Sequence, residues 1–311
     1  MLNCYGTNDF LLFNQYKYDR KEIFKVFYPS RLNKYYHEKK RYLLKNNFIK
    51  ARNLLSDKYS LLKKFNKEIN YPFLLSTDFR EQNTEWILYY LKNEGIVIKP
   101  NIGSSGSYFS HFKVIDDKLK HFSIKNNLIS EHVLKQNTIE QLINIWKEYW
   151  KIDKKGLIMP FFKSKNLISR NFIQLTMRII TINDFMRSSK SIIVDKIWLE
   201  VVCDKGFLIT ILINEKIDTI YSTNLINSKN FNEKFLDSLK MNQDNVNFSV
   251  KECCNLATNF HSSIPNINQV AWDFIPNVNQ NSNIFLEGNS EFGIRTPSML
   301  SYLNKKNINL K

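Results

Sequence analysis

Acidic and amide side chains interrupt two apolar segments near the end of the chain. Asp273 lies in Val-Ala-Trp-Asp-Phe-Ile, and Glu287 and Asn289 lie in Ile-Phe-Leu-Glu-Gly-Asn. A carboxylate inside an apolar strand is costly to bury without a partner. Because Glu287 and Asn289 are two positions apart, they share one face of a strand. Such oxygen donors suit Mg²⁺, which takes a few carboxylates together with waters and substrate phosphates. Exposed strand ends are the simpler interpretation.

A second candidate is the segment Asn-Ile-Gly-Ser-Ser-Gly-Ser (101–107), which closely follows Lys99. The chain has only eight glycines, and two of them lie here. Clustering in a glycine-poor chain indicates backbone in an unusual conformation or close to another group. Between two strands, the segment would offer successive N–H groups and hydroxyls to phosphate oxygens. An ordinary hairpin turn is the alternative, and the common fingerprints GxxxxGK[ST] and GxGxxG are absent.

Arg178 is a charge inside the apolar strand-like segment Thr-Met-Arg-Ile-Ile-Thr-Ile. The planar guanidinium matches phosphate and carboxylate oxygens, so it could clamp a phosphate or acyl phosphate. A structural salt bridge to one of the acidic residues has equal weight. General-base candidates are few, and the one considered is His261, at the end of a predicted helix. A lone histidine there is more often a hydrogen-bonded structural residue.

The elements that must position these residues follow from hydrophobic periodicity. Segment 95–100 predicts a short buried strand ended by proline, and 108–115 alternates like a second strand. Helices are predicted over 31–66, over 138–150 with Thr138 as N-cap, and over 250–261. Further strands are predicted over 157–162, 177–182, 192–202, 207–213, 270–274 and 284–286. Strands interspersed with helices indicate α+β or α/β architecture, and we expect α+β.

Composition limits the class of protein. The chain has 311 residues, enough for one large two-lobed domain or two domains, and its 43% hydrophobic and 14% aromatic content excludes a disordered chain. The net charge of +16 is compatible with a polyanionic partner such as nucleic acid, an acidic glycan or an anionic membrane surface. Because the lysines are scattered, a general compositional bias explains the charge more simply.

The sequence predicts a cytoplasmic protein with reduced thiols. No stretch approaches the roughly 20 apolar residues that span a bilayer, and residues 1–19 lack the features of a secretory signal. The four cysteines, which have no CxxC spacing, are Cys4, Cys203, Cys253 and Cys254. Neighbouring cysteines on a helix seldom bridge each other, so neither a disulfide framework nor a zinc site is indicated.

In their order along the chain, these segments resemble an ATP-grasp enzyme. Gly-Ile-Val-Ile-Lys-Pro-Asn-Ile-Gly-Ser-Ser-Gly (95–106) resembles that family's strand lysine and phosphate-covering loop. Trp-Asp and Leu-Glu-Gly-Asn resemble its two magnesium-binding strands. With Leu-Ile-Met-Pro-Phe-Phe-Lys-Ser-Lys-Asn-Leu (157–167) and Thr-Met-Arg-Ile-Ile-Thr-Ile, they resemble the sugar-transfer-associated branch. The resemblance covers about residues 55–295.

The resemblance implies an ATP-grasp fold, in which two α+β lobes sandwich ATP behind a helical, basic N-terminal segment. It places the N-terminal region at 1–75, the first lobe at 76–157 and the second at 158–311. The implied ATP-binding residues are Lys58, Lys99, Gly103, Ser104, Ser105, Gly106, Ile158, Met159 and Phe161, the last three through backbone at the adenine. The implied ligands of one or two Mg²⁺ ions are Asp273, Glu287 and Asn289, while Lys99 and Arg178 are the implied catalytic residues.

Some positions depart from the branch. Met159 stands where glutamine is common, and Lys165 where histidine is common. A glycine-rich stretch is replaced by Ile-Val-Asp-Lys-Ile-Trp-Leu-Glu (193–200). These departures concern recognition of the acceptor more than binding of ATP.

The resemblance implies an ATP- and Mg²⁺-dependent ligase that joins a carboxylate to an amine through an acyl phosphate. The substrates would be small molecules or glycans of a surface polysaccharide, with contact to an anionic membrane or acidic glycan compatible with the charge. The first alternative is a kinase that uses the same groups. The second is a non-catalytic polyanion-binding protein, resting on basic residues interleaved with Tyr35, Tyr36 and Tyr42. Nucleic acid is not the expected partner.

Overall fold

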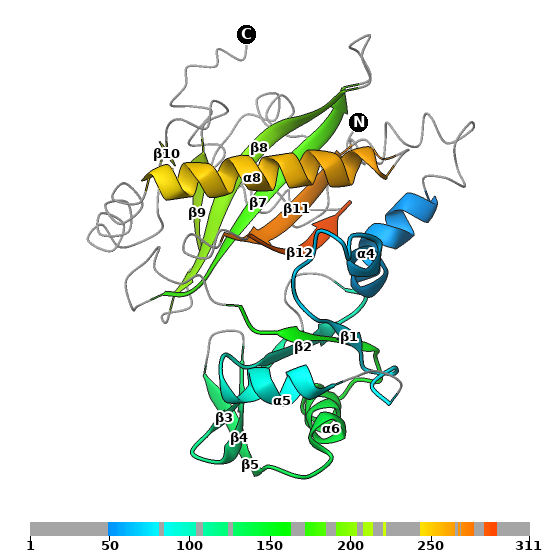
Figure 1. The fold of residues 1–311 in the computed structure, drawn as a ribbon, viewed down its shortest axis with the longest axis vertical. Helices are drawn as coiled ribbons and strands as arrows, with labels where there is room; N and C mark the ends of the chain where they lie inside the picture. Colours follow the sequence, from blue (N-terminus) through cyan, green and yellow to red (C-terminus); the bar gives the residue numbers. More distant parts are fainter. Residues whose placement is uncertain are drawn as a thin grey trace, which may run out of the picture.

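Two antiparallel sheets stand one above the other in the molecule (Figure 1). The structure is a computed structural model that describes residues 49–80, 84–103, 108–123, 127–162, 172–184, 191–203, 208–213, 220–221, 243–264, 267, 269–276 and 283–290. Helices pack on the faces of both sheets, which makes the fold α+β, as predicted. The predicted N-terminal helix before residue 49 lies outside the described residues, as do Tyr35, Tyr36 and Tyr42.

The first sheet has the order β1-β6-β2-β3-β4-β5. Its strands are β1 (Leu74–Leu75), β2 (Ile96–Pro100), β3 (Ser110–Ile115), β4 (Lys118–Phe122), β5 (Leu128–Val133) and β6 (Gly156–Pro160). Helices α5 (Glu85–Lys92) and α6 (Thr138–Trp150) pack on one face, around Ile96, Ile98 and Phe112. Side chains alternate along β2, so Val97 joins the other core cluster, which includes residues of the second sheet.

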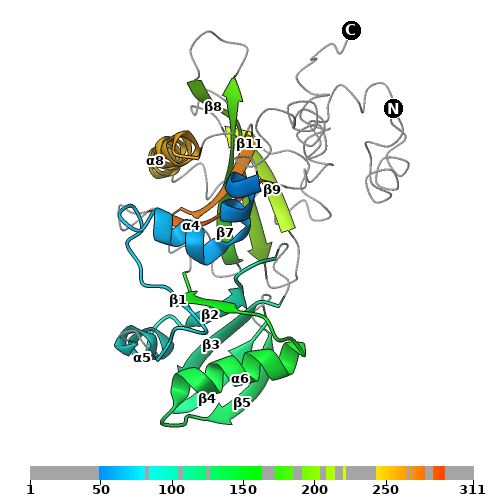
Figure 2. The ribbon, with the colours of Figure 1, turned by 90° about the vertical axis from the view of Figure 1, so that its right-hand side faces the viewer.

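The second sheet has the order β10-β9-β8-β7-β11-β12. Its strands are β7 (Phe172–Asp184), β8 (Ser191–Cys203), β9 (Leu208–Ile213), β10 (Ile220–Tyr221), β11 (Gln269–Ile275) and β12 (Ile284–Asn289). Helix α8 (Gln243–Ser262) crosses one face, as Figures 1 and 2 show. That face is apolar and contributes Met177, Ile179 and Trp272 to the core. The opposite face of β7 and β11 is therefore the one that carries the charged residues.

Helix α4 (Lys58–Lys64) corrects the prediction of one long helix over 31–66. Residues 49–56 are helical, but the helix is interrupted at Asp57, whose carboxylate accepts a hydrogen bond from the N–H of Ser60 at 2.9 Å and caps a new helix. Helix α4 packs beside β12 (Figure 1). The second correction concerns α6, because its N-cap is Asn137 and the Thr138 hydroxyl donates instead to the carbonyl of Lys135.

A β-bulge shapes the end of the second sheet. Asp273 of β11 pairs with Glu287 of β12, but the next residue, Phe274, pairs with Phe285, so β12 has one extra residue at Leu286. The bulge allows Phe285 to enter the core while Glu287, two positions on, turns to the same side as Asp273. Without it, the two-residue period of a strand would place Phe285 and Glu287 on one face.

Cys253 and Cys254 are buried, free thiols in α8, as predicted for this pair. Burial raises the pKa of the Cys254 thiol to about 12, so it stays protonated at neutral pH. None of the helices within the described ranges is long and apolar enough to cross a membrane.

The packing of Gly288 against Trp272 gives the first prediction. A Cβ at Gly288 would lie 2.7 Å from the Trp272 ring and 3.0 Å from Leu55. We expect Gly288→Ala to lower the free energy of unfolding by about 1–3 kcal/mol, because both neighbours are buried and have little room to move. Urea unfolding measures this loss. In a Trp272→Phe background the same substitution should cost less, and equal losses in the two backgrounds would contradict the close approach.

Candidate functional site

Three charged residues meet across three neighbouring strands of the second sheet. Asp273 on β11 is in register with Arg178 on β7 and with Glu287 on β12. Arg178 Nε donates to Asp273 Oδ1 at 2.6 Å, and its Nη2 donates to Oδ2 at 2.7 Å. Asp273 is only 4% exposed, so this bidentate pair supplies the cation that its buried carboxylate requires. The salt-bridge interpretation of Arg178 therefore describes the structure, and its phosphoryl role stays a prediction.

Glu287 contacts two lysines from outside its own sheet. Its Oε2 lies 3.6 Å from Lys99 Nζ and 3.8 Å from Lys58 Nζ. Asn289 Nδ2 donates to Glu287 Oε1 and to Asp273 Oδ2, at 3.3 Å each. These six residues form one continuous group, which we call the carboxylate–lysine cluster: Lys58, Lys99, Arg178, Asp273, Glu287 and Asn289. Each of them was a candidate from the sequence.

The first sheet and α4 are tied together in a way that brings the two lysines side by side. Asn101, just after β2, accepts hydrogen bonds from the Lys58 N–H through its carbonyl at 3.2 Å and from the Tyr59 N–H through Oδ1 at 2.7 Å. Its Nδ2 donates to Asp57 Oδ1 at 2.9 Å. Lys58 begins α4 and Lys99 lies in β2, so this network fixes both ammonium groups near Glu287.

The glycine segment begins beside the same lysine. Lys58 Nζ donates to the carbonyl of Gly103 at 2.6 Å. Gly103 has φ of +146°, a conformation that side-chain-bearing residues rarely adopt, which explains glycine at this position. The other predicted loop residues, Ser104, Ser105 and Gly106, lie outside the described residues, as does Lys165.

Burial and charge act against each other on the ionisable groups. Burial alone would raise the pKa of Glu287, but Lys99, Lys58, the hydrogen bond from Asn289 and Arg178 together lower it below its ordinary value. Burial lowers the pKa of Lys58, and the positive charge of Lys99 adds to that effect, while Glu287 opposes it. The carboxylate form of Glu287 is thus strongly favoured at neutral pH.

The predicted adenine-binding residues lie at the end of β6. The Ile158 side chain packs toward α5 and α6, so only its backbone could line a ligand between the sheets. Met159 alternates to the other face and joins the core that includes the second sheet. The Phe161 ring stacks on His111 with centroids 4.0 Å apart, and its N–H donates to the carbonyl of Gly95 at 2.9 Å. Phe161 lies where the chain leaves the first sheet.

The donor set of the cluster fits a magnesium ion. Asp273 and Glu287 offer two adjacent carboxylates, and Asn289 reaches both with its amide, whose oxygen could face a metal after a half-turn. Within the described ranges, no three His, Cys, Asp or Glu side chains gather in a metal-binding group. Two carboxylates are what Mg²⁺ takes when waters and substrate phosphates complete its shell.

The sequence did not reveal three residues that hold the cluster in place. Asp57 and Asn101 form the link between α4 and β2, and the buried Tyr71 hydroxyl donates to the carbonyl of Phe285 beside the bulge. A signal existed only for Asp57, an aspartate at an N-cap position before an apolar helix. Asn101 and Tyr71 act across the fold, over sequence distances that no local pattern covers.

His261 is a structural residue in α8. Its Nδ1 lies 2.7 Å from the Thr181 hydroxyl and its Nε2 3.2 Å from the Ile267 carbonyl, and Trp272 Nε1 donates to the same hydroxyl. Burial lowers its pKa to about 4, so it stays neutral. A cavity of about 440 Å³ lies elsewhere, between β5 and α6, where His132, Lys135 and Glu148 are among its lining residues. None of the cluster residues lines it.

No protein-family model and no curated protein matches the chain. Among solved structures it is similar to a D-alanine–D-alanine ligase from Bacillus anthracis complexed with ATP, with 11% identity, 83% of this chain and 62% of that chain covered, and a TM-score of 0.43. The D-alanine–D-alanine ligase from Helicobacter pylori is 14% identical over 80% of this chain and 57% of that chain, with a TM-score of 0.36. N5-carboxyaminoimidazole ribonucleotide synthetase from Thermotoga maritima is 11% identical over 76% of this chain and 42% of that chain, with a TM-score of 0.35. The chain thus spans less than two thirds of their lengths.

The lowered pKa of Glu287 predicts how stability depends on pH. A folded-state pKa below the value of about 4.3 in an unfolded chain means that the carboxylate stabilises the fold above that pH. This contribution should be lost as the pH falls through the folded-state pKa. We therefore expect the free energy of unfolding of Glu287→Gln to fall less steeply than that of the wild type below about pH 4.3, as measured by urea unfolding at a series of pH values.

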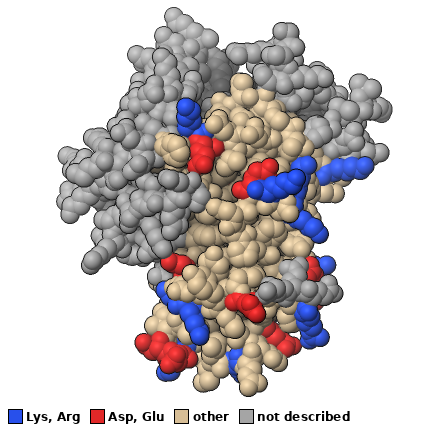
Figure 3. Space-filling view, in the orientation of Figure 1, with Lys and Arg blue, Asp and Glu red and all other residues tan. Residues whose placement is uncertain are grey.

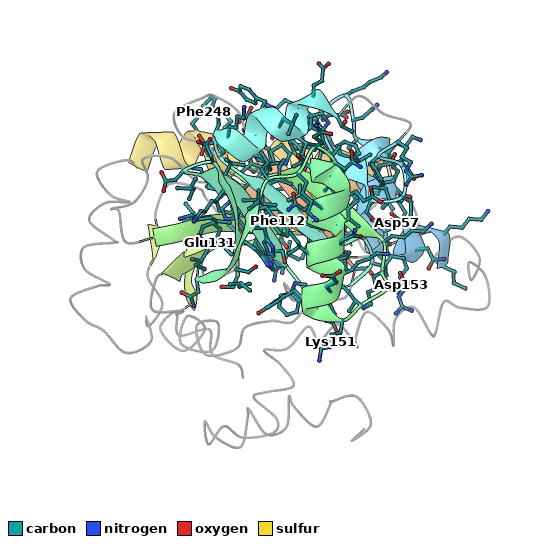
Figure 4. The ribbon with its side chains drawn as sticks, turned by 90° about the horizontal axis from the view of Figure 1, so that it is seen from below. Asp57, Phe112, Glu131, Lys151, Asp153 and Phe248 are labelled. Carbon is teal, nitrogen blue, oxygen red and sulfur yellow. The ribbon has the colours of Figure 1, made fainter. Side chains whose placement is uncertain are left out.

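Glu131→Gln is the matched control. Glu131 lies on the outer strand β5 (Figure 4), with Lys120 at 3.2 Å and Lys118 at 3.8 Å, in a more exposed setting. Exposed ion pairs contribute little to stability, so this variant should follow the wild-type profile. If Glu287→Gln also follows it, the lysines do not stabilise the Glu287 carboxylate.

Proposed function

We propose that this chain is an ATP- and Mg²⁺-dependent ligase that joins a carboxylate to an amine, with the two-lobed arrangement of ATP-grasp enzymes. One observation carries the proposal. Three cationic side chains and two carboxylates, from α4, the first sheet and the second sheet, converge between the two sheets, in the order of sequence segments that resembles that family. A structural role alone would not require five charges at one place.

The binding roles follow from the chemistry of each group. The Lys58 and Lys99 ammonium groups are compact positive charges beside a loop entry, and they would neutralise the phosphates of ATP. The backbone at the end of β6 and just after it, at Ile158, Met159 and Phe161, would line the adenine. Arg178, the more exposed member of its pair with Asp273, would contact the phosphoryl group in transfer. Its fork can keep one bond to Asp273 while it makes another to a phosphate oxygen.

The proposed reaction has two steps. A carboxylate oxygen of the substrate attacks the γ-phosphorus, the bond from phosphorus to the β–γ bridging oxygen breaks, and ADP leaves. The amine nitrogen then attacks the acyl carbon, the carbon–oxygen bond to phosphate breaks, and a proton passes to solvent. Lys99 and Arg178 would offset the charge on the phosphoryl oxygens during the first step.

Asp273, Glu287 and Asn289 would hold the magnesium. When bound, the metal supplies positive charge to the β- and γ-phosphate oxygens. The chain's own contribution is placement, because the register of β11 and β12 sets both carboxylates side by side.

The finer assignment rests on motifs alone. We propose the sugar-transfer-associated branch, a carboxylate substrate from surface polysaccharide synthesis and a cytoplasmic location. On the face seen in Figure 3, basic and acidic side chains of the described residues alternate. This favours scattered charge over a basic docking area on that face.

Nucleotide binding gives the next prediction. MgATP at 100 times its Kd should raise the free energy of unfolding by about 2.7 kcal/mol, which raises the melting temperature by several degrees. We expect thermal unfolding to show this for the wild type and for Lys120→Ala, which removes a lysine of β4 that is paired with Glu131 on the edge strand β5. Lys99→Ala should abolish most of the shift. If the melting temperature of Lys99→Ala rises as much as that of the wild type, Lys99 does not contribute to nucleotide binding.

The acyl phosphate gives the second prediction for this function. Hydroxylamine intercepts an acyl phosphate, so turnover of the correct carboxylate with ATP should yield ADP, phosphate and a hydroxamate. Screening carboxylates by ADP release, with and without amines, identifies the substrate. Phosphorus NMR then separates the two enzyme classes, because a kinase gives a stable phosphorylated product in place of free phosphate. Turnover without hydroxamate would contradict the ligase.

A further inference from the structure

The charge of the carboxylate–lysine cluster does not match that of a preformed cation site. Lys58, Lys99 and Arg178 contribute three positive charges, while Asp273 and Glu287 contribute two negative charges, which leaves the cluster at +1. Asp57, whose carboxylate also acts on Lys58, lies just outside the cluster. A divalent cation that arrives alone therefore meets three cationic side chains beside the two carboxylates, and these cations would attract a polyphosphate.

Every carboxylate oxygen in the cluster already has a partner. Arg178 takes both oxygens of Asp273, and Asn289 shares the second of them. On Glu287, Asn289 takes Oε1, and both lysines lie at Oε2. A carboxylate has about four acceptor positions, so a metal ion must share or compete for these oxygens with the donors already present. Mg²⁺ also gives up its own waters reluctantly.

The two carboxylates differ in how firmly they are held. The bonds from Arg178 to Asp273 are 2.6 and 2.7 Å, as short as charge-assisted hydrogen bonds become. The lysine nitrogens lie 3.6 and 3.8 Å from Glu287 Oε2, which is ion-pair distance without a good hydrogen bond. Lys58 has a better partner in the Gly103 carbonyl at 2.6 Å. The lysines are thus the donors that can most readily leave.

We propose that Lys58 and Lys99 keep Glu287 closed to free divalent cations, so that the metal joins the site together with a nucleoside triphosphate. The nucleotide half rests on the proposed function, whereas the closing by lysines is a property of the chain alone. Phosphate oxygens draw the ammonium groups away from Oε2, and the released carboxylate oxygen then accepts the metal. By thermodynamic linkage, nucleotide and metal strengthen each other's binding by the same factor.

Mn²⁺ binding to the full chain without nucleotide tests directly whether the two lysines keep free divalent cations from Glu287. The electron paramagnetic resonance signal of free Mn²⁺ reports how much metal remains unbound. We expect Lys58→Met and Lys99→Met to bind Mn²⁺ about tenfold more tightly than the wild type, because each removes a positive charge beside a metal-binding oxygen. Calorimetry with a non-hydrolysable ATP analogue and no metal should show affinity about tenfold weaker in the same variants. A variant that is misfolded would lose affinity for both Mn²⁺ and the ATP analogue.

Three control variants locate the effect. Lys120→Met removes a lysine that is paired with Glu131 at 3.2 Å on the outer strands, and it should bind Mn²⁺ as the wild type does. Lys99→Arg keeps the charge and should bind Mn²⁺ as the wild type does, which separates the loss of charge from the change of side chain. Lys58→Met and Lys99→Met remove different lysines, so either one tests the proposal if the other fails to fold. Adding Glu287→Gln to Lys99→Met should return the Mn²⁺ affinity to about the wild-type value, because the carboxylate that binds the metal is then absent.

The outcomes separate this inference from the proposed function. Wild-type Mn²⁺ affinity equal to that of the methionine variants, or weaker binding by those variants, would overturn the closing by lysines. If Mn²⁺ binding rises as expected but the ATP analogue does not bind the wild type, the closing stands and the proposed function is wrong. If the analogue binds yet leaves the wild-type Mn²⁺ affinity unchanged, the coupled entry of metal and nucleotide is wrong.

Discussion

Two carboxylates face each other across neighbouring strands, and the rest of the molecule must make that arrangement tolerable. Like charges directly opposite on a sheet repel, and Asp273 has almost no contact with solvent. Arg178, from the same sheet, neutralises the Asp273 carboxylate through an ion pair. Among the described residues, the lysines that pair with Glu287 come from α4 and β2, so Glu287 gains these ion pairs when α4 and the first sheet are in place. The same contacts that satisfy the charges therefore hold the two sheets together.

Apolar packing sets the geometry in which these charges meet. The bulge at Leu286 separates the direction of Phe285 from that of Glu287, and the Tyr71 hydroxyl holds the backbone there through the Phe285 carbonyl. Phe285 packs among Phe65, Phe260 and Trp272, whose rings anchor β12 to α4 and α8. Gly288 lets the Trp272 ring lie against the backbone between the metal-ligand candidates. In the Glu-Gly-Asn motif, Gly288 thus packs against the core, while Glu287 and Asn289 on either side of it are candidate metal ligands.

Local patterns in the sequence predicted most elements and the members of the carboxylate–lysine cluster other than Lys58, which only the resemblance to ATP-grasp enzymes implied. Charged residues within apolar strands are visible because burying them requires a reason, and this is why Asp273 and Arg178 stood out. Strand limits were less accurate, since β7 extends over Phe172–Asp184 where 177–182 was predicted. The pairing of Arg178 with Asp273, the break at Asp57 and the link through Asn101 depend on contacts between distant segments. No periodicity of 2 or 3.6 residues records such contacts.

The position of β12 near the far end of the described chain affects how the protein is made. Lys58, Tyr71 and Leu55 all have partners in this last described strand, so a nascent chain on the ribosome leaves them without these partners until β12 has emerged. Contacts of such wide sequence separation form late and slowly. The first sheet can pair its own strands earlier, with Lys99 still lacking its counter-charge. The carboxylate–lysine cluster can therefore assemble only after β12 has been made, because Glu287 is the residue that its two lysines share.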